Sequence, residues 1–362
     1  MTNKREFPYN TLPMLPPAVD LDTKEILRKT ISANKALAEL KGWAFSQSNP
    51  LLLLQSITLQ EAKSSSEIEN VVTTNDELYQ AFATPSDKNI PPAAKEVLHY
   101  KEALWYGYQE IINGSPLTIN KFVELFRIIK RRSDGIRNLP GTVLRNTYNE
   151  IVYTPPDNSD DIMRLMTNLE QYINIDFLDD RDPLIKLAII HYQFECIHPF
   201  PDGNGRVGRI INVLYLVYQK LLDFPILYLS RYITQHKKEY YHALMGVTES
   251  SAWDSWIMYI LDAIEVTARE TLISTQNIYT AQENLFLLLK EKAPDLCSKE
   301  FVELLFEQPY CKISFLVDRG IAKPQTASKY LKRLCDLNIL QLIKRGRENY
   351  YINKVLWDIL TR

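Results

Sequence analysis

Hydrophobic positions recur at helical spacing along most of the chain. Between residues 22 and 42 the apolar side chains return every three, four or seven residues, which predicts an amphipathic helix. The same spacing predicts further helices over 51–65, 93–112, 119–131, 160–173, 183–196, 210–222, 234–247, 253–274 and 275–295. Glycine is scarce, at 11 residues, and helix-forming residues are common, so the pattern predicts a mainly α-helical fold.

Two of these segments are apolar on almost every face. They are residues 183–196 and 210–222, and a helix without a polar face is expected in the core. His191 lies in the first of them, and we expect it to be a buried histidine that makes hydrogen bonds.

Three regions depart from the helical pattern. Residues 5–20 contain several prolines, which favour an extended arm lying across the body of the protein. Residues 84–92 are expected to form a loop. Residues 142–145 and 151–154 are β-prone runs on either side of a turn at 146–149, which predicts a hairpin.

The last part of the chain has a different order of elements. Three short helices and two strands are predicted over 301–306, 312–318, 326–337, 339–343 and 349–352, with a basic turn at 344–347. This order resembles a winged helix, with Lys329, Lys332 and Arg333 on the polar faces of the expected recognition helix. DNA binding and docking of a protein both stay open for this unit.

Composition excludes several classes of protein. The net charge of −2 provides no global basic field for nucleic acid. No apolar run is long enough to span a membrane, so no membrane partner is expected. The four cysteines include no Cys-x-x-Cys pair and are expected to be reduced and mostly buried, as in a cytoplasmic protein.

Candidate chemistry is concentrated in residues 197–209, which read Ile-His-Pro-Phe-Pro-Asp-Gly-Asn-Gly-Arg-Val-Gly-Arg. Gly-Asn-Gly between two helices can turn backbone N–H groups towards an anion, where the helix dipole adds to the attraction. Arg206 and Arg209 lie one turn apart and can reach the same anion. His198 can titrate near neutral pH, and Asp202 offers an oxygen ligand to Mg²⁺. These residues predict a site for phosphate chemistry, although Pro-Asp-Gly-Asn-Gly alone is also ordinary turn chemistry.

The stretch resembles the signature of the Fic family, His-Pro-Phe-x-Asp/Glu-Gly-Asn-Gly-Arg-x-x-Arg, at every fixed position. The resemblance implies transfer of AMP from ATP to a Ser, Thr or Tyr hydroxyl of a target protein. It implies that His198 is the general base, that Asp202 holds Mg²⁺, and that Phe200 anchors the loop by packing. The residues implied in nucleotide binding are Glu69, His198, Gly203, Asn204, Gly205, Arg206, Val207, Gly208, Arg209 and Tyr241.

A second motif stands well before the first. Ser65-x-x-x-Glu69-Asn70 resembles the inhibitory motif of Fic proteins, Ser/Thr-x-x-x-Glu-Gly/Asn, in the class whose inhibitory helix is N-terminal. The resemblance implies that Glu69 pairs with Arg209 and withholds it from the γ-phosphate of ATP. Read locally, the serines and the glutamates after them instead predict the N-terminal cap of a helix.

The family resemblance also implies an organisation and partners. The expected domains are an N-terminal helical segment with the inhibitory helix (1–92), a Fic catalytic domain (93–275) and a winged-helix-like domain (276–362). A flap at 142–154 would pair with the target protein by β-augmentation. Tyr241 would lie near the adenine, although a core tyrosine explains it equally.

Function and assembly are not fully decided by these motifs. The fixed residues do not separate transfer of AMP from its removal or from transfer of another phosphate-linked group. The chain could instead be a DNA-binding regulator whose Fic core senses ATP. Self-modification is expected, and a homodimer is left open.

Overall fold

The fold was analysed in a computed structural model, which describes residues 4–47, 49, 51–84, 89–145, 148–345 and 348–361. The helices within these ranges are α1 (Lys24–Phe45), α2 (Leu51–Ile68), α3 (Asn75–Ala83), α4 (Pro92–Ile112), α5 (Ile119–Lys130), α6 (Ser159–Asn174), α7 (Pro183–Ile197), α8 (Asn204–Tyr218), α9 (Leu229–Gln235), α10 (Lys237–Ser250), α11 (Trp253–Lys292), α12 (Lys299–Glu307), α13 (Ile313–Asp318), α14 (Pro324–Asp336) and α15 (Lys354–Thr361). The strands are β1 (Leu144–Arg145), β2 (Ile151–Tyr153), β3 (Tyr310–Cys311), β4 (Leu340–Arg345) and β5 (Glu348–Asn353). The mainly helical fold is therefore confirmed.

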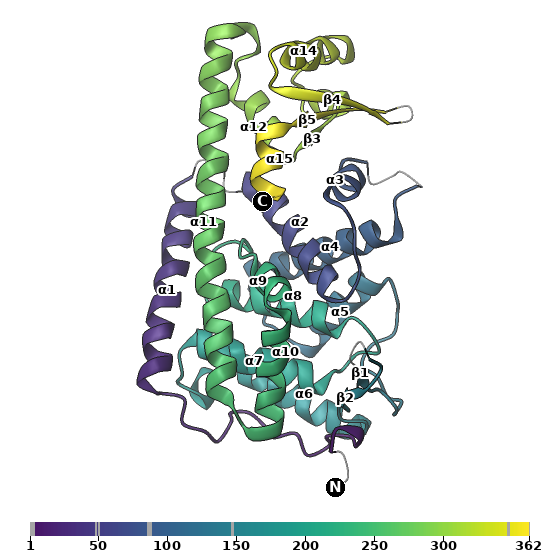
Figure 1. The fold of residues 1–362 in the computed structure, drawn as a ribbon, viewed down its shortest axis with the longest axis vertical. Helices are drawn as coiled ribbons and strands as arrows, with labels where there is room; N and C mark the ends of the chain where they lie inside the picture. Colours follow the sequence, from purple (N-terminus) through teal and green to yellow (C-terminus); the bar gives the residue numbers. More distant parts are fainter. Residues whose placement is uncertain are drawn as a thin grey trace.

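Helices α7 and α8 form the centre of the lower body of the molecule (Figure 1). Nearly all their residues are buried, as their apolar faces predict, and amphipathic helices pack around them. His191 of α7 is a core histidine, as expected. Its Nε2 lies 2.9 Å from the hydroxyl of Tyr240, and its ring stacks on Trp256. The segment that joins α7 to α8 carries the motif, so the motif is held between two buried helices.

The N-terminal arm crosses the lower end of this body, as its prolines predict (Figure 1). The amide of Tyr9 donates to the carbonyl of Thr154 over 3.0 Å, just beyond β2. Further along, the amide of Leu15 donates to Asn168 Oδ1 of α6 over 2.7 Å. The arm therefore lies directly against the predicted hairpin. That hairpin is present as β1 and β2, while Asn146 and Thr147 of its turn lie outside the described residues.

Helix α2 links the lower body to the C-terminal unit. Near its start, Ser56 Oγ donates to the carbonyl of Glu307 in α12 over 2.9 Å. Near its middle, the buried carboxyl of Glu61 accepts hydrogen bonds from the amide and hydroxyl of Ser230 in α9. One turn later, the hydroxyls of Ser64 and Tyr228 lie 2.9 Å apart. These hydrogen bonds fix α2 against α12 at one end and against residues 228–230 nearer the other.

The C-terminal unit contains α12 to α15 and an antiparallel sheet in the order β3-β5-β4. It lies beside the upper part of α11 and above α2 and α3 (Figure 1). The predicted helices and strands are present, each shifted by a few residues at its ends. Strand β3 and helix α15, which no pattern predicted, complete the unit. Gly346 and Arg347 of the predicted basic turn lie outside the described residues.

The prediction of two successive helices over 253–274 and 275–295 was wrong, because α11 runs from the first into the second. It is one 40-residue helix that continues through residue 275. The joining sequence Ser274-Thr275-Gln276-Asn277 contains neither glycine nor proline, so nothing in it ends the helix. The division into domains at 92 and 275 stays a prediction.

Other boundaries were also wrong. The predicted helix over 234–247 is two helices, because His236 has a non-helical backbone between α9 and α10. Helix α8 ends at Tyr218 and not at residue 222. Two residues after its end, Lys220 turns the chain with a positive φ. Helix α3 was not predicted. Part of the predicted loop 84–92, residues 85–88, lies outside the described residues.

Candidate active site

The motif loop ends α7 and begins α8. His198 follows the last residue of α7 in the left-handed region, with φ of 50°, and its amide donates to the carbonyl of Phe194. Asn204 holds the loop closed, since its side-chain amide both donates to and accepts from the backbone of Phe200. The ring of Phe200 is buried and stacks on Phe126 at 4.6 Å, which confirms its packing role.

Gly203 sets the direction of the N-terminus of α8. Its φ of 78° favours glycine, and helix α8 begins at the next residue. The amides of Asn204, Gly205 and Arg206 are the first three of the helix and have no acceptor within it. A helix N-terminus of this kind can bind an anion, and the expectation that it does so here stays a prediction.

The guanidinium of Arg209 is buried and bound entirely by α2 and the residue after it. Its Nε donates to Ser65 Oγ, and its Nη2 donates to the Ser65 carbonyl and to Glu69 Oε1, each over 2.8 Å. Gly205 makes this contact feasible, because a Cβ there would lie 2.1 Å from Glu69 Oε1. The motif helix and the predicted inhibitory motif therefore meet at Arg209, through one ion pair and two hydrogen bonds to Ser65.

Glu69 remains ionised in this contact. Burial alone would raise the pKa of Glu69, but the charge and hydrogen bond of Arg209, followed by the charge of Arg206, lower that pKa below its ordinary value. Its charge also reaches Tyr241, whose pKa is raised to about 12 by burial and then by Glu69. Tyr241 is partly exposed and lies edge-on to Tyr240, at the margin of the cluster.

The local interpretation of the inhibitory motif as a helix start was wrong. Residues 65–68 form the last turn of α2, and Asn70 ends the helix with a φ of 62°. The amide of Val71 donates to the carbonyl of Ser66, and that of Asn70 donates to Glu67, which is the Schellman arrangement. Asparagine and glycine are the residues that best adopt this conformation, so position 70 serves to stop the helix directly after Glu69.

Arg206 and Asp202 each pair with a residue of another helix. Arg206 Nη1 donates to Glu96 Oε2 of α4 over 2.7 Å, and Asp202 Oδ2 lies 2.6 Å from Lys130 Nζ of α5. Burial would raise the pKa of Asp202, but Lys130 and Arg206 lower it. Sequence reasoning missed Glu96 and Lys130, since nothing in the chain order relates them to the motif.

His198 is a neutral imidazole. Burial, followed by the positive charge of Arg137, lowers its pKa to about 4. Arg137 Nε donates to the His198 carbonyl over 2.7 Å, and its Nη2 donates to the carbonyl of Ile197. Arg137 thus holds the strained turn and disfavours protonation of the ring. It was missed because it lies in an irregular segment far from the motif in sequence.

Val207 and Gly208 have packing roles in the structure. Val207 is fully buried, and a Cβ at position 208 would lie 2.5 Å from Glu195 Oε1 of α7. Burial raises the pKa of Glu195 to about 7, against the lowering effect of Arg209. The implied part of Val207 and Gly208 in nucleotide binding stays a prediction.

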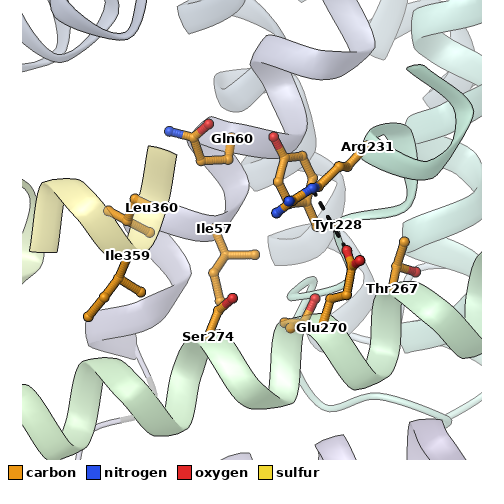
Figure 2. Close-up of a pocket in the computed structure, with 10 residues that line it drawn as sticks. Ile57, Gln60, Tyr228, Arg231, Thr267, Glu270, Ser274, Ile359 and Leu360 are labelled. Carbon is orange, nitrogen blue, oxygen red and sulfur yellow. Dashed lines mark ion pairs between the residues drawn. The ribbon is translucent and has the colours of Figure 1, made fainter. Parts of the chain in front are cut away.

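A small cavity lies away from this site, where α2, α9, α11 and α15 meet (Figure 2). Its volume of about 30 Å³ has room for about one water molecule. Arg231 and Glu270 form an ion pair of 3.8 Å at its edge, shown by the dashed line in Figure 2. The cavity is therefore too small to be a nucleotide site.

Three models of known protein families match the sequence of this chain. The model described as Fic/DOC family N-terminal matches residues 27–109, Fic/DOC family matches 116–216, and Protein adenylyltransferase SoFic-like, C-terminal domain, matches 282–356. The chain belongs to the Fic/DOC family. The three matches follow one another in chain order and include α2, the motif and the C-terminal unit.

Relatives and solved structures extend this result. Proteins named Protein adenylyltransferase Fic from Drosophila erecta and Drosophila willistoni are 27% and 26% identical, over 51% and 56% of this chain. The matched parts are only 35% and 40% of those fly proteins. A Fic family protein from Desulfovibrio desulfuricans G20 has a TM-score of 0.61 at 17% identity, over 93% of this chain and 98% of its own. That similarity shows a shared Fic fold along nearly the whole chain.

Three further observations apply to the described residues as a whole. Among the described residues, no group of three or more His, Cys, Asp or Glu side chains is placed to hold a metal ion. No helix in the described ranges has the length and apolar character needed to cross a membrane. The four cysteines are free, with Cys196 and Cys311 buried.

The cap of α2 gives a prediction about stability. Asn70→Val should lower the free energy of unfolding by about 1–2 kcal/mol, because a β-branched residue strongly disfavours the left-handed region. Asn70→Gly should change it by less than about 0.5 kcal/mol, because glycine adopts that region freely. Urea unfolding of both variants measures the difference. Equal losses for the two variants would contradict the role assigned to position 70.

The environment of His198 predicts its titration. With a pKa of about 4, its imidazole should show no NMR titration between pH 8 and pH 5.5, whereas in urea-unfolded chain it should titrate near about 6.5. Resonances would be assigned by comparison with His198→Ala. A folded-state midpoint near 6.5 would show that burial and Arg137 do not keep the ring neutral.

Proposed function

We propose that this chain is a protein adenylyltransferase that moves AMP from ATP to a hydroxyl of a target protein. The observation that carries the proposal is the convergence of His198, Asp202, Arg206 and Arg209 on the N-terminus of α8. The names of the fly relatives support the same reaction.

The proposed chemistry divides among these residues. The neutral imidazole of His198 accepts the proton of the target hydroxyl, whose oxygen forms a bond to the α-phosphorus of ATP. The bond from that phosphorus to the bridging oxygen of the β-phosphate breaks in line, and pyrophosphate leaves. The first amides of α8 stabilise the charge on the α-phosphate. Arg206 and Arg209 hold the β- and γ-phosphates once Glu96 and Glu69 release them.

Mg²⁺ fits the residues at Asp202. The carboxylate of Asp202 is half-exposed and already faces a cation, the ammonium of Lys130. One carboxylate, with phosphate oxygens and water, is a ligand set that Mg²⁺ accepts. When bound, the ion would neutralise phosphate charge, and Lys130 would have to leave the carboxylate.

The proposed autoinhibition by Glu69 rests on its ion pair with Arg209. Only one of the two anions, the carboxylate or the γ-phosphate, can occupy that guanidinium, and the two repel each other. ATP bound beside Glu69 would hold its α-phosphate out of line with the attacking hydroxyl.

The target segment would pair with the flap formed by β1 and β2, as the resemblance implies. The N-terminal arm bonds to Thr154 just beyond β2, and among the described residues only β2 pairs with β1, so the other edge of β1 would take an added strand. Self-modification on a hydroxyl of this chain is included in the proposal, and intact mass after incubation with Mg-ATP would reveal it. No described contact bears on a homodimer or on the cytoplasmic location, so both stay expectations.

The C-terminal unit would be a winged helix, with α14 as its recognition helix. Helices α12, α13 and α14 precede the antiparallel hairpin of β4 and β5, and Lys329 and Lys332 are exposed on α14. Arg333 is instead paired with Asp295. Whether the unit takes DNA or protein is decided by the salt dependence of binding, which should be steep for DNA.

Removal of His198 tests the reaction. His198→Ala should lower label incorporation from α-labelled ATP by about 10²–10⁴-fold, because the proton acceptor is lost. Nucleotide binding should be largely unchanged, because the amides and guanidiniums remain. Rates within a few-fold of wild type would remove His198 from the mechanism. Salt-sensitive DNA binding without any label transfer would favour a regulator with an ATP-sensing core.

Release of Arg209 tests the inhibition. Glu69→Gly should raise the initial rate of AMP incorporation at least roughly tenfold, since misalignment by about an ångström can cost on the order of 100-fold. Arg209→Ala should not reproduce the gain, because it removes the phosphate ligand together with the contact. The double variant should lose most of the gain.

Glu67→Gly provides the matched control for this experiment. It places the same flexible residue near the end of α2 and removes a carboxylate that does not pair with Arg209. Its rate should stay near that of wild type. If Glu69→Gly does not exceed this control, with both proteins folded, Glu69 is not an inhibitor.

A further inference from the structure

A pocket of about 260 Å³ lies between α2 and α4, on residues that the proposed reaction does not use. Most of its lining is apolar, and the apolar residues are Leu54, Phe82, Leu98, Leu104, Trp105 and Pro225. The polar residues are Gln55, Thr58, Lys101 and Glu102. An apolar pocket with few polar groups is the usual form of a site for a small organic molecule.

Lys101 is the distinctive group in this pocket. Its Nζ lies 4.1 Å from the centroid of the Phe82 ring and donates to the neutral Oε1 of Gln55. In the described part of the chain, no carboxylate lies within ion-pair distance of Lys101, and Glu102 is paired with Arg131. The ammonium is thus held among apolar groups without a counter-charge, which is costly. Burial lowers the pKa of Lys101 to about 8 for the same reason.

We propose that this pocket binds a small organic monoanion, a carboxylate with an apolar body. The carboxylate would supply the missing partner of Lys101, and the apolar body would lie against Phe82, Leu104 and Trp105. Charge complementarity selects this class. A neutral apolar ligand leaves the ammonium without a counter-charge, and a polyphosphate needs more cations than Lys101, the one cation among the described residues that line the pocket.

Hexanoate and its neutral isostere hexanamide are the probes for a binding experiment by calorimetry at pH 7. Hexanoate should bind the full chain at one saturable site, roughly 10–100-fold more tightly than hexanamide, as expected for a charge-assisted hydrogen bond. Lys101→Met keeps the length and apolar stem of the side chain and should lose most of that preference. Lys95→Met, an exposed lysine on the same helix, should bind as wild type does.

A measurement on the unaltered protein avoids dependence on the folding of a variant. Brief treatment with acetic anhydride, followed by peptide mass analysis, reports the acetylation rate of each lysine. Saturating hexanoate should slow acetylation of Lys101 several-fold and leave Lys95 unaffected. Equal binding of hexanoate and hexanamide, undiminished binding to folded Lys101→Met, or unaltered acetylation of Lys101 would each overturn the proposal.

Discussion

The buried guanidinium of Arg209 is the group on which the arrangement of the site depends. A charge removed from water must be matched by hydrogen bonds and an opposite charge, or the folded state is strongly destabilised. All of its described partners come from Ser65 and Glu69, at the end of α2. That requirement brings together two segments that are distant in the chain, and Gly205 leaves the space in which their side chains meet.

The position of α2 is set by more than this ion pair. Its Glu61 bonds to Ser230 of α9, and its Ser64 bonds to Tyr228 just before α9. Its last carbonyl, that of Ile68, accepts from Lys237 over 2.6 Å. These contacts hold the helix whether or not Glu69 is bound to Arg209. Replacement of Glu69 should therefore remove the carboxylate from the guanidinium without releasing the helix, while the hydrogen bonds of Arg209 to Ser65 remain.

Opposite charges are matched throughout the site. Glu69 faces Arg209, Glu96 faces Arg206, and Lys130 faces Asp202. Each cation proposed to bind phosphate has a carboxylate in place of the phosphate, and the carboxylate proposed to bind Mg²⁺ has an ammonium in place of the metal. These four charged motif and inhibitory residues therefore have partners of opposite charge within the protein. Binding of Mg-ATP would exchange these internal partners for external ones of the same charge.

Local sequence determined much of this protein. The apolar faces of 183–196 and 210–222 marked the core helices, the prolines marked the arm, and Gly203 and Asn204 marked the turn that directs the amides of α8. These features depend on neighbours in the chain, whose spacing can be read directly. The motif resemblance added the pairing of Glu69 with Arg209, which no local pattern contains.

Only the tertiary structure decided the remaining features. The serines before Glu69 suit a helix start, yet α2 continues through them, where Ser64 contacts Tyr228 and Ser65 contacts Arg209, and Asn70 ends it. Glu96, Lys130 and Arg137 act on the motif from other helices and loops, and their sequence neighbours give no sign of it. The low pKa of His198 likewise arises from burial and from Arg137. A sequence specifies which charges exist, whereas packing determines which of them meet and how far each is removed from water.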